Sequence, residues 1–184
     1  MADYTDNIFL ASIKALDNVV LPAVDPADPL AGEQLRLVSG FLKFLRSRGP
    51  RLGLRLHFEL GHYLALAQDV APDARLVSDE VSLRLESAIE QAVAMQRQAC
   101  APDSEIRAAT AALAAPISAL VRLVAGAEDG LRRRVEQKVV TGSKRWVDMQ
   151  RSWFLPQGFE LRPGDLPGLD ESLATPEAAP RQAN

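Results

Sequence analysis

The sequence predicts an all-α fold, an up-and-down bundle of four to five antiparallel helices with kinked second and fourth helices and an extended C-terminal tail. Only 5% of the residues are aromatic, and Leu, Ala and Val supply most of the apolar residues. That balance favours helices over strands. No run alternates apolar and polar residues as a half-buried strand does. Instead, apolar residues recur at helical spacing, beginning with Phe9, Ile13, Leu16 and Val20.

The first predicted helix ends at Pro22, and the second begins where Asp28 and Pro29 have the pattern of an N-cap followed by a first-turn proline. Gly49-Pro50 interrupts this second helix. Because a proline inside a helix removes a hydrogen bond and clashes with the preceding turn, at a cost of about 3 kcal/mol, we expect a kink or a short break there. Before the break, one face of the helix collects Val38, Phe41, Leu42 and Leu45.

A turn around Pro72 precedes the third predicted helix, which Ser78 caps and which ends before Pro102. A fourth helix begins directly after Pro102, and Pro116 is expected to bend it. Beyond Gly126 the same apolar period resumes, so the fourth helix either continues or is followed by a fifth. Short connections between long amphipathic helices indicate antiparallel neighbours.

At 184 residues and 20.0 kDa, the chain has the length of a single domain. We assign residues 1–158 to a helical bundle domain. Residues 159–184 are rich in proline and glycine and hold few apolar side chains, which is typical of a segment without a core of its own. We therefore predict an extended, partly disordered tail, with disorder over about its last ten residues.

Composition excludes several classes of protein. The net charge of −3 and the pI near 5.5 argue against a nucleic-acid binder, because such proteins need basic residues to neutralise phosphates. Cys100 is the only cysteine, so no intrachain disulfide and no cysteine metal cage can form. No apolar run reaches the roughly 18–20 residues of a spanning helix, and the first residues are acidic rather than basic. We expect a cytoplasmic protein without a nucleic-acid or membrane partner.

Catalytic patterns are absent or incomplete. No Gly-x-Ser-x-Gly elbow, dinucleotide fingerprint or P-loop occurs, and no cofactor is predicted. Glu59 and His62 have the Glu-x-x-His spacing with which helical bundles bind metals. A di-iron site needs a second such pair, however, and the chain has only two histidines. The helical angles also direct His62 away from the apolar stripe, towards the expected outside.

Basic residues concentrate at the predicted break in the second helix. Between residues 34 and 58 there are six basic residues and no acid, and four of the arginines flank Gly49-Pro50: Arg46, Arg48, Arg51 and Arg55. An anionic group such as a phosphorylated ligand, an acidic helix or a membrane headgroup could bind there. The alternative is a solvated face whose arginines pair with acids from elsewhere in the fold, such as those of the third helix.

Aromatic residues concentrate near the end of the last helix, where Trp146, Trp153 and Phe154 lie close together in the sequence. Either the tail folds back over them or these rings form an interface with another chain. Both interpretations remain open at this level.

Three functions are compatible with these features. The sequence favours a non-catalytic helical protein that acts through protein contacts, as a homodimer or as the accessory partner of another protein. The alternative is a bundle that binds a small molecule with an apolar or acyl body and an anionic head near the four arginines. A more remote alternative is a metal-dependent enzyme that uses Glu59 and His62.

Overall fold

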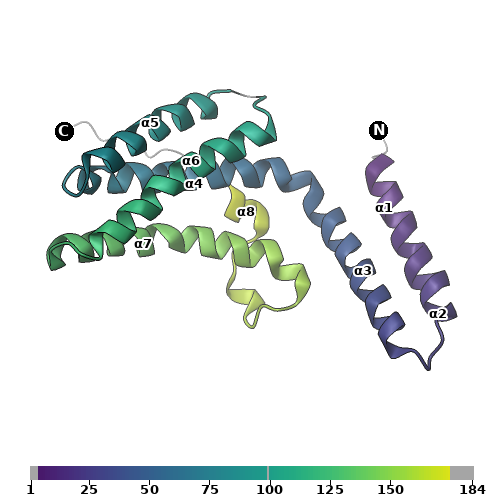
Figure 1. Cartoon of the computed structure of the whole chain (residues 1–184). Helices are drawn as coiled ribbons and strands as arrows, with labels where there is room; N and C mark the ends of the chain where they lie inside the picture. Colours follow the sequence, from purple (N-terminus) through teal and green to yellow (C-terminus); the bar gives the residue numbers. More distant parts are fainter. Residues whose placement is uncertain (1–3, 99, 175–184) are drawn as a thin grey trace. The chain divides into compact units, whose positions relative to one another are not determined.

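Figure 1 shows the computed structural model, which describes residues 4–98 and 100–174. Every regular element in these residues is helical and none is a strand, so the predicted all-α class is confirmed. The described residues contain six long helices, slightly more than predicted: α1 (Tyr4–Ala15), α3 (Pro29–Arg48), α4 (Leu52–Ala74), α5 (Asp79–Gln96), α6 (Asp103–Val124) and α7 (Asp129–Phe154).

The described chain forms two compact units. The first comprises the described residues up to Leu52 together with Trp153–Pro163. The second comprises Gly53–Ser152 together with the described residues from Gly164 onwards. The 3-10 turn Gly49–Arg51 separates α3 from α4, at the Gly-Pro pair where the sequence predicts a break.

The first unit is built on a helical hairpin. Its first arm is α1, which continues through a π-helical turn (Leu16–Val20) into the short α2 (Leu21–Ala23). A short linker then reverses the chain into α3, which runs back alongside the first arm (Figure 1). Asp28 caps α3 as predicted, because its carboxylate accepts a hydrogen bond of 3.0 Å from the Ala31 backbone N–H.

The second unit contains the main hydrophobic core. Leu60 of α4, Leu85 of α5 and Leu113 of α6 are completely buried in it, and Val135 brings α7 into the same cluster. Among the described residues, α6 alone is long and apolar enough to cross a membrane, judged by length and composition. One face of α6, from Ile106 to Val124, is buried in this core, whereas Val121 and Leu123 on its other side are 36% and 48% exposed.

A buried carboxylate joins α4 to α7. Asp73, only 3% exposed, accepts a hydrogen bond of 2.6 Å from Arg134 Nε and one of 2.8 Å from Lys138 Nζ. Burial raises the pKa of the Asp73 carboxyl, but the hydrogen bonds from Lys138 and Arg134 outweigh it, and the net pKa is lowered. These contacts attach the first half of α7 to the last turn of α4.

The last turn of α4 corrects one expectation. The sequence predicts a turn around Pro72, but α4 runs through that residue to Ala74. A proline so near the end of a helix costs only one intrahelical hydrogen bond, and the burial of Asp73 and Ala74 keeps the turn helical. The next helix, α5, begins as predicted with Ser78, whose hydroxyl accepts from the Val81 N–H at 3.4 Å.

Part of the predicted extended tail is folded. Residues 169–173 form the short helix α8 (Leu169–Leu173), in which Ser172 and Leu173 are buried. The Ser152 hydroxyl of α7 donates to the Pro167 carbonyl at 3.1 Å and also contacts the Ser172 hydroxyl at 3.3 Å. This segment therefore folds back onto α7. The predicted disorder of the last ten residues concerns a part of the chain outside the described residues.

Replacement of Asp73 by asparagine should destabilise the protein by about 1–3 kcal/mol, because it leaves two cations without their buried partner. The matched control is Asp129→Asn, at an exposed position paired with Arg132, where we expect a loss below about 0.5 kcal/mol. Urea unfolding near neutral pH measures both free energies. Equal effects of the two substitutions would contradict this role of Asp73.

The lowered pKa of Asp73 predicts that the free energy of unfolding depends on pH. Because the pKa of Asp73 is lower in the folded chain than in the unfolded chain, its stabilisation is complete above the unfolded value of about 3.9. It is lost as the pH falls through the folded value. The difference in unfolding free energy between wild type and Asp73→Asn should therefore shrink towards zero in acid. A difference that is independent of pH would contradict the assignment.

Candidate functional site

The outer face of α3 exposes a stripe of large apolar side chains. Leu30, Leu37 and Phe41 are 65%, 59% and 55% exposed. At 3.6 residues per turn, the three directions lie within about 40° of one another. Ser39 points in the opposite direction and is buried in the hairpin. We call these three residues the α3 stripe.

The apolar face that the sequence indicates on the second predicted helix is only partly buried, since Leu42 and Leu45 are half-buried. Val38 and Phe41 belong to the face that collects apolar residues in the sequence, yet both are at least half exposed. The face of α3 that packs on the first arm instead contains small and polar residues, with Gly32 and Ser39 buried. Small side chains let the two arms approach closely, and this leaves the apolar face outside the hairpin.

Polar contacts hold the two arms of the hairpin together. Asp17, in the π-helical turn, accepts a hydrogen bond of 2.6 Å from the Ser39 hydroxyl and forms an ion pair of 2.8 Å with Lys43. The hydrogen bond from Lys43, followed by that from Ser39, lowers the pKa of the Asp17 carboxyl. Polar contacts of this kind orient the arms but bury little apolar surface.

The predicted anion site consists of arginines that already have protein partners. Arg46 forms a two-pronged ion pair with Asp6, with distances of 2.6 and 2.9 Å. The Arg48 guanidinium donates to the Trp153 carbonyl at 2.8 Å and lies 5.8 Å from the centroid of its ring. An anion would have to compete with these contacts.

The other two arginines of the cluster are also engaged. Arg51 donates to the Ser47 carbonyl at 3.5 Å. Arg55, in the second unit, pairs with Glu59 at 2.9 Å and donates to the Gln150 side chain at 3.4 Å. Asp6 and Glu59 are thus acidic partners of the cluster, and both lie outside α5. Anion binding by these four arginines stays a prediction.

The three aromatic residues near the end of α7 divide between the two units. Trp153 is 1% exposed, and Phe154 stacks on Phe44 of α3 with 5.8 Å between ring centroids. Both belong to the first unit. Trp146 belongs to the second unit, where its ring lies 6.2 Å from that of His62. A role of these rings in an interface with another chain stays a prediction.

His62 lies among aromatic rings, in contrast to the expectation that it points outward. Its ring centroid is 5.2 Å from that of Tyr63 and 6.5 Å from that of Phe58. Trp146 approaches because α7 packs on the side of α4 that the helical angles assign to the outside. Burial lowers the pKa of His62, and repulsion from Arg145 adds to the effect. The imidazole is therefore neutral near pH 7.

No other side chain that could bind a metal joins the predicted pair of Glu59 and His62 within the described residues. Glu59 is the ion-pair partner of Arg55, and His62 is surrounded by rings. Within residues 4–98 and 100–174, no three His, Cys, Asp or Glu side chains lie close enough together to hold a metal ion. The metal-dependent alternative gains no support from this geometry.

The second unit contains a largely apolar cleft of about 700 Å³ between α4, α6 and α7. We call it the α4–α6–α7 cleft. Leu66 of α4 and Ile117 of α6 are buried, and they line the cleft together with Val121, Val139, Trp146 and Val147. Its polar residues include His62, Arg122 and Arg151, and none of the described residues that line it is acidic. The volume is in the range of small-molecule sites.

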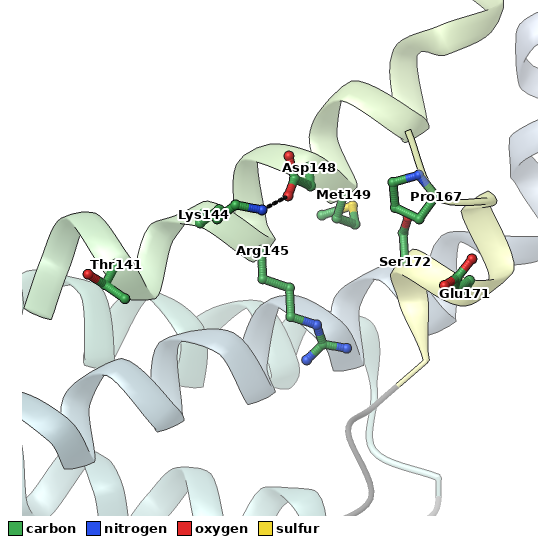
Figure 2. Close-up of a pocket in the computed structure, with 8 residues that line it drawn as sticks. All are labelled: Thr141, Lys144, Arg145, Asp148, Met149, Pro167, Glu171 and Ser172. Atoms are coloured by element: carbon green, nitrogen blue, oxygen red, sulfur yellow. Dashed lines mark hydrogen bonds and ion pairs between the residues drawn. The ribbon is translucent and has the colours of Figure 1, made fainter. Parts of the chain in front are cut away.

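A smaller pocket of about 360 Å³ lies between α7 and α8 (Figure 2). Lys144 and Asp148 form an ion pair of 2.9 Å along α7, on one side of the pocket, and Figure 2 shows Glu171 on the opposite side. Arg145 extends from α7 and donates to the Ala174 carbonyl. Because the charges here are of both signs, this pocket shows no preference for an anion or a cation.

A close helix contact forms one border of the large cleft. A Cβ atom at Gly142 of α7 would lie 3.0 Å from Leu66 of α4, so glycine allows the two helices to approach at this point. Leu66 and His62 line the cleft on one side of this contact, and they also line a cavity of about 580 Å³ that Gly142 borders. The sequence places Gly142 in a helical stripe but gives no sign of a cleft beside it.

Comparison with known proteins assigns the chain to no family, because no family, no curated protein and no solved structure matches it significantly. The residues described above therefore carry the functional argument alone.

The environment of His62 can be tested by NMR titration of the two histidines. We expect the pKa of His62 to lie below the ordinary value of 6.5, and Arg145→Gln should raise it by removing the nearby positive charge. Lys144→Gln, at an exposed position on the same helix, is the matched control and should leave it unchanged. A His62 pKa at or above 6.5 in the wild type would contradict the burial of this ring.

Proposed function

We propose that this protein is a non-catalytic, cytoplasmic helical protein that acts through protein contacts, and that two copies associate through the α3 stripe. The observation that carries the proposal is the exposure of Leu30, Leu37 and Phe41 on one face. Large apolar side chains gathered in one stripe are typical of interaction surfaces. Burial of each such side chain contributes about 1.5–3 kcal/mol.

The size of the hairpin supports the need for a partner. Its two arms bury little apart from Ile13, Gly32 and Ser39, and small units bury too little surface to be stable alone. The outer face of the first arm is also apolar, with Tyr4 and Ile8 exposed. A helix that is apolar on opposite faces is normally covered on both.

A second copy fits the α3 stripe because the surface carries little charge. Of the charged residues between Leu30 and Phe44, only Glu33 lies within about 90° of the stripe. A two-fold axis places the same patch opposite itself, and an uncharged patch meets no repulsion in that arrangement. Two hairpins would supply the four helices of an antiparallel bundle.

The proposal retains several predictions made from the sequence. The up-and-down arrangement of the helices, with kinks at Gly49-Pro50 and Pro116, is part of it. The net charge of −3 supports a protein partner rather than nucleic acid. In a variant of this proposal, a different protein binds in place of the second copy, and the chain is its accessory partner.

Light scattering tests the proposal directly. The wild type should have about twice the 20.0 kDa mass of the chain, and Leu37→Glu should reduce it to that of one chain, because a buried unpaired charge is strongly unfavourable in an interface. The matched control is Leu83→Glu, at a leucine of α5 with a similar exposure of 66%. This variant should keep the doubled mass.

Two outcomes would contradict the proposal. One is a wild type that remains a single chain at all accessible concentrations and co-purifies with no other protein. The other is a doubled mass that persists in Leu37→Glu, which would place the contact elsewhere on the chain. Circular dichroism of each variant shows that a change in mass does not come from unfolding.

A further inference from the structure

We propose that the α4–α6–α7 cleft binds a small amphipathic anion, with an apolar body between the helices and a carboxylate or similar head at Arg122. This inference is independent of the α3 stripe, since all residues of the cleft belong to the second unit. It also differs in place from the anion site predicted at Arg46, Arg48, Arg51 and Arg55.

The apolar side chains that line the cleft indicate that the body of the ligand is apolar. Leu66 and Ile117 are buried at 6% and 5% exposure although they border an open space. Val139 and Trp146 of α7 face the same space. Apolar walls of this kind favour an aliphatic chain or a ring system and offer it few hydrogen bonds.

The charged side chains that line the cleft indicate that the polar head of the ligand is an anion. Arg122 on α6 and Arg151 on α7 both line it, and the part of the chain that the structure describes places no carboxylate in its lining. Arg151 has a partner in Asp148 at 3.6 Å. Arg122, in contrast, forms no hydrogen bond or ion pair with the other described residues. An unpaired guanidinium beside an apolar surface favours an anion whose two oxygens can accept its parallel N–H groups.

The remaining polar groups do not compete with this assignment. His62 is neutral near pH 7 because burial lowers its pKa, so it adds no further positive charge to those of the arginines. The other polar residues that line the cleft are uncharged: Tyr63, Ser118, Ser143 and Gln150. They are neutral groups that can donate to a carboxylate or accept from a protonated head. The selectivity for an anion therefore depends on the arginines.

The experiment is a titration of the full-length protein with dodecanoate below its micelle concentration, followed by tryptophan fluorescence and calorimetry. Trp146 lines the cleft, and the only other tryptophan, Trp153, is buried in the first unit. We expect saturable binding of one dodecanoate per chain with a change in fluorescence. In Trp146→Phe the fluorescence change should disappear while the calorimetric signal remains.

Two variants locate the site. Arg122→Glu should weaken dodecanoate binding at least about tenfold, since it removes a charge-assisted hydrogen bond and adds repulsion. Its matched control is Arg107→Glu, at another exposed arginine of α6 outside the cleft, which should bind as the wild type does. Val121→Trp places a large ring at the edge of the cleft and should abolish binding without a change in charge.

One neutral and one cationic probe test whether the cleft prefers an anionic head group. Dodecanol and dodecyltrimethylammonium have the same chain as dodecanoate, so they should bind at least about tenfold more weakly to the wild type. Equal binding of the three probes would overturn the proposal, as would dodecanoate binding that neither Arg122→Glu nor Val121→Trp reduces. The absence of saturable binding would also overturn it. Circular dichroism confirms that each variant is folded.

Discussion

The attachment of α7 to α4 is the contact on which the second unit depends. At one end of this contact, Asp73 of α4 accepts hydrogen bonds from Arg134 and Lys138 of α7. Further along α7, the absence of a side chain at Gly142 lets Leu66 of α4 approach closely. Because the two helices touch at these points, Trp146 is brought against His62 and one wall of the cleft is defined. A buried carboxylate is costly to leave without its partners, so the two cations of α7 stabilise its position against the end of α4.

The two units bury their apolar residues to different extents. The second has a continuous core around Leu60, Leu85 and Leu113. The hairpin of the first unit has its polar contacts on the inside and the α3 stripe on the outside. Since burial of apolar surface is the main source of stability, the hairpin gains less from its own fold than the second unit does. This difference is the physical basis for the proposed association of two chains.

The sequence predicts the helices well because their signals are local. Apolar period, the caps at Asp28 and Ser78, and the Gly49-Pro50 break each depend on a few neighbouring residues. The period shows which residues share a face, but not which neighbour covers it. For this reason the helical angles direct His62 to the outside although α7 covers it, and the apolar period around Phe41 does not reveal that this ring is exposed. The partners of Asp73 lie about sixty positions away, so no local pattern could reveal them.

The most direct test of the central claim is a distance between two copies of the chain. Cys100 is the only cysteine and is exposed, so a Cys100→Ser background permits a single spin label at Leu37→Cys. If two chains associate through the α3 stripe, the label should show a short, well-defined distance to its copy. If the protein has the doubled mass but labels at Leu37→Cys give no measurable distance between the two copies, the account is contradicted.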